Sequence, residues 1–381
     1  MLAVSRDVLM GGAAPVRSSV DGPHGAPRRV AVLRALQLGD LLCAVPALRA
    51  LRRAWPQAEI TLIGLPWAAA FARRFAHLVD RFLEFPGFPG LPERKPDLAG
   101  LPAFLATAQG MHFDVALQLH GRGDVTNGVV AALGADMTAG FHARGGICPD
   151  PARYTAWPEE GTEIERLLRL VDFLGIPRAG TELEFPVTSS EVRAAQSLCA
   201  AHGLRAGAYA CVHPGARLHS RRWPPEYFAD VAKALSAAGL RVVLTGSEEE
   251  AQLTRFIADR VAGAVDLAGR TPLGVLAGVL RGARMLVCND TGVSHVAAAL
   301  GTPSVVVSCG ADPDRFAPLD HARHEVLHRA VSCRPCAYDH CPVGHPCARD
   351  LVPDRVIERV AARLAASRDR GPRVPMAATP G

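Results

Sequence analysis

The chain has 381 residues, of which 49% are hydrophobic, and it carries a formal net charge of +5. This hydrophobic share is too high for a disordered protein, and at ~150 residues per domain the length predicts two domains. The mild positive charge suits an anionic ligand or membrane surface but is too weak to indicate nucleic acid binding. We find no apolar run of ~20 residues and no signal-peptide pattern, so we expect a cytoplasmic protein without a transmembrane helix.

The two ends of the chain differ in composition from the rest. Residues 1–27 are rich in small residues and proline without periodicity and predict a disordered leader, and residues 370–381 predict a disordered tail. Order begins with a strand at 28–33 and a turn, after which Asp40 starts a helix with one apolar stripe. Further strands are expected at 59–63, 113–119, 208–212, 241–245, 265–267, 283–289 and 304–308. Further helices are expected at 67–75, 124–133, 162–174, 225–238, 248–261, 272–280, 291–300 and 353–366.

Strands that alternate with helices of this length predict parallel sheets with helices on both faces. Residues 175–190, which contain Pro177, Gly180 and Pro186, separate two such halves. We therefore expect two facing doubly wound domains at 28–183 and 184–352, followed by a closing helix at 353–369.

Ligands of open α/β sheets bind beyond the carboxyl ends of the strands. The loops expected there, which would line one cleft between the domains, are Gly39-Asp40, His120-Gly121-Arg122, His213-Pro214-Gly215, Gly246-Ser247-Glu248 and Asp290-Thr291-Gly292.

The stretch from Asp290 to Pro303 shows most clearly how such a loop could bind a ligand. An apolar strand precedes it, helical spacing of apolar residues follows Asp290, and Gly301 ends the helix. The backbone N–H groups of Thr291 and Gly292 then lie at a helix N-terminus, which attracts phosphate. The alternative is a capped core helix, with Asp290 as its N-cap and His295 on the surface.

Two nucleotide-binding patterns are missing from the chain. No G-x-G-x-x-G follows the first strand, which argues against a dinucleotide-dependent oxidoreductase, and no Walker A pattern occurs. The only D-x-D, Asp312-Pro313-Asp314, is too short a pattern to indicate metal-dependent sugar transfer.

Several motifs occur in an order that resembles a known family. They are Leu38-Gly39-Asp40 with Val45-Pro46-Ala47-Leu48, His213-Pro214-Gly215-Ala216-Arg217, Arg221-Arg222-Trp223-Pro224, Thr245-Gly246-Ser247-Glu248, residues 267–273 and residues 290–295. Together they resemble glycosyltransferase family 9, the heptosyltransferases of lipopolysaccharide core assembly, over residues 28–365. The resemblance implies a GT-B fold and inverting transfer from a nucleotide-activated sugar that requires no metal or other cofactor. It suggests ADP-heptose as donor and a lipopolysaccharide core or related cell-envelope glycan as acceptor. Peripheral contact of the protein with the inner membrane is left open.

The resemblance makes Asp40 the general base that takes a proton from the acceptor hydroxyl. A carboxylate can do so within hydrogen-bond reach of that hydroxyl. The alternative is that Asp40 only caps its helix. Gly39 and Arg122 are assigned to the acceptor side, although Arg122 could equally be a loop arginine without a ligand.

The remaining matched positions are assigned to the donor. Without a divalent metal, the charge of the departing nucleoside diphosphate must be met by cations and helix N-termini. Arg221 would serve where family members more often carry Lys, unless it lies on a solvated face. Glu248 would bind the ribose hydroxyls, although Glu249 and Glu250 are adjacent and all three suit a helix start. The other residues assigned to the donor are Gly215, Ala216, Thr271, Asp290, Thr291, Gly292 and His295.

A cysteine cluster lies at residues 333–347. Cys333, Cys336, Cys341 and Cys347 are close in sequence, which in a cytosolic chain favours a structural zinc site. Reduced thiols or a redox pair are the alternatives.

The sequence thus predicts a glycosyltransferase, with two alternatives left open. One is a catalytically silent subunit that binds a nucleotide sugar, and the other is a GT-B epimerase acting on UDP-sugars. No nucleic acid partner is expected.

Overall fold

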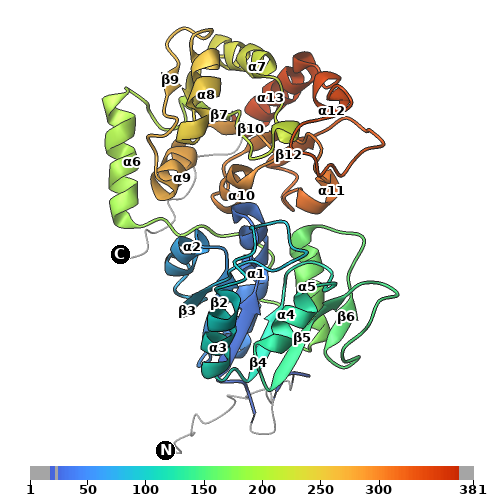
Figure 1. The fold of residues 1–381 in the computed structure, drawn as a ribbon. Coiled ribbons are helices and arrows are strands. Elements are labelled where there is room, and N and C mark those ends of the chain that lie inside the picture. Colours follow the sequence, from blue (N-terminus) through green and yellow to red (C-terminus); the bar gives the residue numbers. More distant parts are fainter. Residues whose placement is uncertain (1–17, 22–24, 369–381) are drawn as a thin grey trace, which may run out of the picture.

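The computed structural model describes residues 18–21 and 25–368. It divides them into two lobes, one above the other in Figure 1, each built on a parallel sheet with helices on both faces. This is the GT-B arrangement expected from the sequence.

The N-terminal sheet has six parallel strands in the order β3-β2-β1-β4-β5-β6. Because the strands are covered on both faces, the central strand β1 is apolar after Arg29, and these four residues are buried. The strands are β1 (Arg29–Leu33), β2 (Glu59–Gly64), β3 (Arg81–Glu84), β4 (Val115–Gln118), β5 (Met137–His142) and β6 (Tyr154–Ala156).

The C-terminal sheet repeats this topology, in the order β12-β11-β10-β7-β8-β9. In both sheets the strand order reverses beside the first strand, at the β1/β4 boundary and at the β7/β10 boundary, where doubly wound folds bind ligands. The strands are β7 (Tyr209–His213), β8 (Arg241–Leu244), β9 (Val265–Asp266), β10 (Met285–Asn289), β11 (Ser304–Val307) and β12 (His324–Leu327).

Helices fill both faces of the two sheets. In the N-terminal domain they are α1 (Leu38–Ala54), α2 (Ala68–Arg74), α3 (Leu101–Gly110), α4 (Thr126–Ala132) and α5 (Glu163–Phe173). In the C-terminal domain they are α6 (Ser189–Ala201), α7 (Pro225–Ala237), α8 (Ala251–Ala258), α9 (Leu273–Gly282), α10 (Gly292–Ala299), α11 (Pro313–Phe316), α12 (Pro346–Arg349) and α13 (Pro353–Arg368). Two short 3₁₀ turns, η1 (His219–Arg221) and η2 (Glu248–Glu250), lie in the C-terminal domain.

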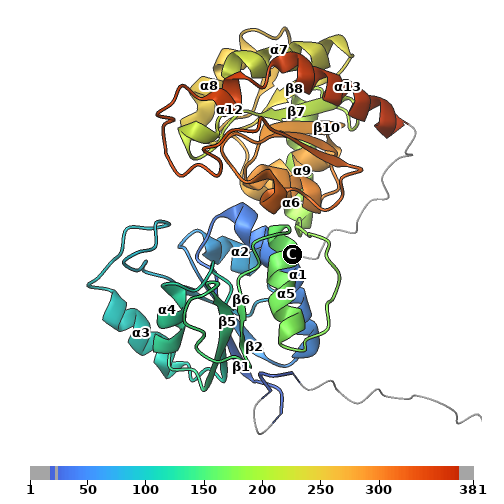
Figure 2. The ribbon, with the colours of Figure 1, turned by 90° about the vertical axis from the view of Figure 1, so that its right-hand side faces the viewer.

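The two domains pack directly against each other. One hydrophobic cluster contains residues of both, including Leu41 of α1 and Val296 of α10, and these two helices are in contact. Figure 2 shows α6 at the junction of the two lobes. There the Arg74 guanidinium of α2 makes a two-pronged ion pair with Glu191 of α6 at 2.6 and 2.8 Å, and these hydrogen bonds hold the pKa of Glu191 at about 2.

The structure differs from the sequence prediction in several places. Part of the expected disordered leader is ordered, because Val20 is buried and the Ser19 N–H donates to the Leu174 carbonyl at 3.0 Å. The expected tail at 370–381, like residues 1–17, lies outside the described residues. Several elements were not predicted, namely β3, β5, β6, β12, α3, α6, α11 and α12.

Candidate active site

Asp40 lies in the first turn of α1, at the carboxyl end of the N-terminal sheet. The helix begins at Leu38 with Gln37 as its N-cap, so Asp40 is its third residue and does not start it as expected. Asp40 does help to cap the helix, because its carboxylate accepts the Gln37 backbone N–H at 3.3 Å as part of a capping box. The side chain is therefore held at a helix N-terminus and keeps part of its surface exposed.

Three charged side chains, Arg34, Glu163 and Arg315, lie close to this turn. Arg34, completely buried after β1, donates its Nε–H to the Asp40 backbone carbonyl at 2.8 Å and an Nη–H to the Leu119 carbonyl. Its other Nη contacts Glu163 Oε1 at 2.9 Å. The second oxygen of Glu163 accepts Arg315 Nε–H at 2.8 Å. Because Arg315 is on α11, this ion triad joins the two domains.

The triad determines how the nearby carboxyl groups ionise. Burial raises the pKa of Asp40, which Arg34 and Arg315 lower and Glu163 raises further. Burial alone would also raise the pKa of Glu163, but Arg34 and Arg315 reverse the effect and hold this pKa at about 2. Glu163 is therefore ionised at neutral pH, whereas Asp40 ionises less readily than an ordinary aspartate.

The segment at 290–303 folds as a turn and the helix α10 between the strands β10 and β11, as the sequence predicts. Thr291 caps α10, and its hydroxyl accepts the Val293 N–H at 3.4 Å, so Asp290 is not the N-cap. Asp290 instead accepts the Ser308 hydroxyl at 3.1 Å, and burial raises the pKa of Asp290 while His295 lowers it. The interpretation of His295 as a surface residue is wrong, because this side chain is only 4% exposed.

The N-termini of α1 and α10 meet across the domain junction. A Cβ on Gly292 would lie 3.1 Å from Leu38 Cβ, and one on Gly39 would lie 2.7 Å from His295 Cδ2. His295 Nδ1 is also 3.6 Å from the Cys43 sulfur of α1. These contacts bring the expected base and the expected phosphate-binding turn into one site, and glycine at 39 and 292 permits the close approach.

Arg221 lies beside this turn, at the end of η1. Its Nη2–H donates to the Cys336 carbonyl at 3.2 Å, while its buried Nε has no hydrogen-bond partner within the described residues. Arg221 also lowers the pKa of Asp290, which places the two charges close together. Trp223, two residues further on, is firmly anchored. Its backbone N–H donates to Asn289 Oδ1 at 3.0 Å, and the Trp223 ring is buried.

The acidic residues after β8, Glu248 to Glu250, differ from the expectation that Glu248 is the one that faces the site. Glu248 is exposed, whereas Glu250 turns inward, accepts the Ser247 N–H at 2.9 Å and lies 3.9 Å from His213 Nε2. A Cβ on Gly215 would lie 2.0 Å from the Glu250 carboxylate, so a larger residue there would force the Glu250 side chain to move. Ala216 is buried, and its carbonyl accepts the Arg222 Nε–H at 2.8 Å. Thr271 is half-buried at the start of α9.

On the acceptor side, Arg122 lies in the loop after β4. It is exposed and forms an ion pair with Asp124 at 3.0 Å. The neighbouring His120 is buried, accepts the Ala35 N–H on Nδ1 at 3.2 Å, and directs Nε2 toward Glu93 at 3.4 Å. Contact with His120 lowers the pKa of Glu93 against the opposing effect of burial, and Arg217 of the other domain lowers it further.

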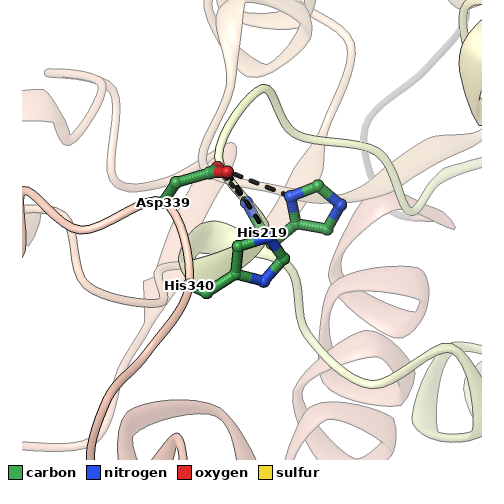
Figure 3. Close-up of side chains that lie close together, drawn as sticks. All are labelled: His219, Asp339 and His340. Carbon is green, nitrogen blue, oxygen red and sulfur yellow. Dashed lines mark hydrogen bonds and ion pairs between the residues drawn. The ribbon is translucent and has the colours of Figure 1, made fainter.

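The cysteine cluster does not form a four-thiol site in the structure. Among the described residues, the ligand atoms that converge within 4.8 Å of one another belong to His219, Asp339 and His340, all exposed. Figure 3 shows this group, in which the imidazole rings stack 4.3 Å apart and each contacts the carboxylate. Cys347 is buried, and Cys341 accepts the His345 N–H at 3.2 Å. The expected zinc site at Cys333, Cys336, Cys341 and Cys347 stays a prediction.

Sequence reasoning missed the residues that complete the site. Arg34, Glu163 and Arg315 belong to none of the sequence motifs, and Glu250 was considered only as a neighbour of Glu248. The sequence offered no signal for Glu163, because an acidic residue directly after the Thr162 cap ordinarily faces solvent and its neighbours Glu160, Glu165 and Arg166 are charged as well. Asp312, part of the D-x-D, accepts the Asp314 and Arg315 backbone N–H groups as the N-cap of α11. The D-x-D thus orients Arg315.

No helix in the described part of the chain combines the length and apolar character needed to span a bilayer.

Comparison with known proteins gives a consistent picture. The family model described as glycosyltransferase family 9 (heptosyltransferase) matches residues 107–346. The chain is 28% identical to lipopolysaccharide heptosyltransferase 2 of Salmonella typhimurium over 222 residues, 55% of this chain and 62% of that protein. It is 25% identical to lipopolysaccharide heptosyltransferase 1 of Escherichia coli over 300 residues, 75% of this chain and 89% of that protein. The match to heptosyltransferase 2 therefore spans less than two thirds of that relative.

Solved structures share the fold. The glycosyl transferase family 9 protein from Veillonella parvula has a TM-score of 0.73 at 20% identity, covering 89% of this chain and 97% of that chain. The E. coli ADP-heptose lps heptosyltransferase II has a TM-score of 0.66 at 22% identity, covering 89% and 99%.

Proposed function

Because the chain belongs to glycosyltransferase family 9, we propose that it transfers heptose from ADP-heptose to a lipopolysaccharide core or a related cell-envelope glycan. The names of its relatives support this choice of sugar and acceptor, and the name of the E. coli heptosyltransferase II structure includes the donor. The observation that carries the proposal is the meeting of the Asp40 turn with the N-terminus of α10.

In the proposed reaction, Asp40 accepts the proton of the acceptor hydroxyl as that oxygen attacks the anomeric carbon of the donor. The bond from this carbon to the ADP oxygen breaks on the opposite face, so the configuration inverts. A base works best when its pKa lies near the operating pH, and burial raises the pKa of Asp40 in that direction.

The leaving group carries negative charge that needs stabilisation. The backbone N–H groups of Thr291 and Gly292 at the N-terminus of α10 and the Arg221 guanidinium, whose Nε lacks a hydrogen-bond partner among the described residues, would supply it. Since these groups carry the charge balance, we propose that transfer requires no divalent metal. Retention of full activity in EDTA is the expected result.

The proposal is tested by incubating the purified chain with ADP-, GDP- and UDP-sugars and a Kdo-lipid A acceptor, then identifying products by mass spectrometry. We expect a heptose added to the acceptor with release of ADP. Donor binding without transfer would instead indicate a silent subunit, and release of UDP without any acceptor would indicate an epimerase. Either result would overturn the proposal.

We also propose that the protein works in the cytoplasm at the surface of the inner membrane, where a lipid-linked acceptor would be presented. The formal net charge of +5 is consistent with contact with anionic lipids. Co-sedimentation with vesicles containing anionic lipid, but not with neutral vesicles, is the expected result.

A further inference from the structure

The ion triad of Arg34, Glu163 and Arg315 joins the domains beside the proposed base. Glu163 is completely buried and uses one oxygen for each arginine, at 2.9 Å to Arg34 and 2.8 Å to Arg315. A buried carboxylate shared by two cations in this way is costly to separate from either of them. The contact with Arg315 therefore belongs to the joined arrangement of the two domains.

Arg315 is placed for this contact by residues of both domains. Asp312 caps α11 and accepts the Arg315 backbone N–H at 3.2 Å, which orients the short helix. The Arg315 guanidinium lies 5.5 Å from the Trp157 ring centre of the N-terminal domain and 5.1 Å from that of Phe316. The Arg315 side chain thus extends from the C-terminal domain and packs against Glu163 and Trp157 of the N-terminal domain.

The charges around Asp40 balance only when Arg315 is present. Asp40 and Glu163 contribute two negative charges, and Arg34 contributes one positive charge from the same domain. Arg315 contributes the second positive charge from the other domain, and the electrostatic effect between Arg315 and Asp40 is mutual. From α10, His295 faces the same groups, and burial lowers its pKa against the opposing effects of Asp290 and Glu163.

We propose that Arg315 is a positioning residue of the active site, which acts through Glu163 to keep Asp40 ionised when the donor-binding domain is joined to the acceptor-binding domain. Packing of the domains removes water from Asp40, and this disfavours the carboxylate that must act as base. The same packing brings Arg315 close to Asp40, and its positive charge favours the carboxylate and so opposes the effect of burial. The base is therefore competent only where donor and acceptor meet. This role rests on the proposed function of Asp40.

The proposal predicts pH shifts of opposite sign for two variants. In Arg315→Gln the carboxylate of Asp40 loses a favourable charge, so the acidic limb of the pH profile of kcat moves up by about one pH unit. In Glu163→Gln an unfavourable charge is lost and the limb moves down. A purely structural role would lower kcat in both variants without opposite shifts. Arg315→Lys keeps the charge and should keep the wild-type limb.

Arg323→Gln is the matched control. Arg323 is half exposed, lies in the same domain and pairs with Asp320 at 3.6 Å, so its loss should leave the profile unchanged. Shifts in the same direction, or no shift, in the Arg315 and Glu163 variants would overturn the proposal.

A second readout does not depend on turnover. In protein labelled with ¹³C at the aspartate carboxyl groups, the resonance missing from Asp40→Asn identifies Asp40, and its titration can be followed by NMR. The same opposite shifts are expected there. If the wild type transfers no sugar but Asp40 titrates as described, the proposed function fails while the electrostatic coupling holds. If transfer occurs but the titration of Asp40 is the same in all variants, the coupling alone fails.

Discussion

At the residue scale, burial and ionisation oppose each other at Asp40. Burial raises its pKa in the folded protein above the value in the unfolded chain. The folded protein therefore favours the protonated form of Asp40. This form stabilises the fold fully at a pH below the pKa of the unfolded chain, and its contribution is lost as the pH rises through the pKa of the folded protein. Asn cannot ionise and can still accept the Gln37 N–H, so Asp40→Asn should be more stable than the wild type at pH 8. Its transfer rate should fall by roughly 10²- to 10⁴-fold.

Thermal unfolding at pH 4 and pH 8, with product formation measured beside it, checks both parts. The control is Asp350→Asn, which changes an exposed carboxylate at the end of α12 and should alter neither quantity. Near-normal turnover of Asp40→Asn would remove Asp40 from the role of base.

At the element scale, the site depends on how closely α1 and α10 approach. Gly39→Ala would place a methyl group 2.7 Å from His295 Cδ2, and His295 is buried, so the two helices must separate. We expect a loss of about 1–3 kcal/mol in the free energy of unfolding, typical of overpacking, and a weaker transfer activity. Urea unfolding and initial rates measure the two effects.

Gly128→Ala is the matched control at this scale. Gly128 is an exposed residue of α4 with nothing within 4 Å of its ideal Cβ. Alanine there should leave activity unchanged and raise stability by up to about 1 kcal/mol. Equal effects of the two substitutions would show that the approach of α1 to α10 is unimportant.

At the scale of the whole molecule, Glu163 makes the joined domains sensitive to acid. Its pKa is about 2 in the folded protein, against an ordinary value of 4.5, because Arg34 and Arg315 outweigh the effect of burial. The folded protein therefore favours the ionised form of Glu163. This form stabilises the fold fully at a pH above the pKa of the unfolded chain, and its contribution is lost as the pH falls from 4.5 toward 2. The full contribution is on the order of 3 kcal/mol, at 1.36 kcal/mol per pH unit.

The stability advantage of the wild type over Glu163→Gln should therefore shrink between pH 5 and pH 2, measured by denaturant unfolding across that range. Glu358→Gln, at an exposed position on α13, should show no such dependence. A constant difference between wild type and Glu163→Gln would contradict the role of the triad in joining the domains.

Several features of the fold were predictable from sequence because they depend on neighbouring residues. Buried parallel strands are continuous apolar runs, as at 285–288, and helices show apolar spacing, as in α5. These local patterns determined the alternation of strands and helices and hence the two doubly wound sheets. The weaker strands β3 and β6 were missed because they are short and half exposed.

The site was predictable only in part. The turn at Asp290–Gly292 and the helix that contains Asp40 are local motifs, and the sequence by itself located both at the carboxyl ends of strands. Which charges meet there was decided by the tertiary structure, since Glu163 and Arg315 are 152 residues apart. No local pattern encodes a contact between domains, because it arises only once both sheets have formed and α1 lies against α10. The burial of His295 and the environment of Asp40 follow from that packing alone.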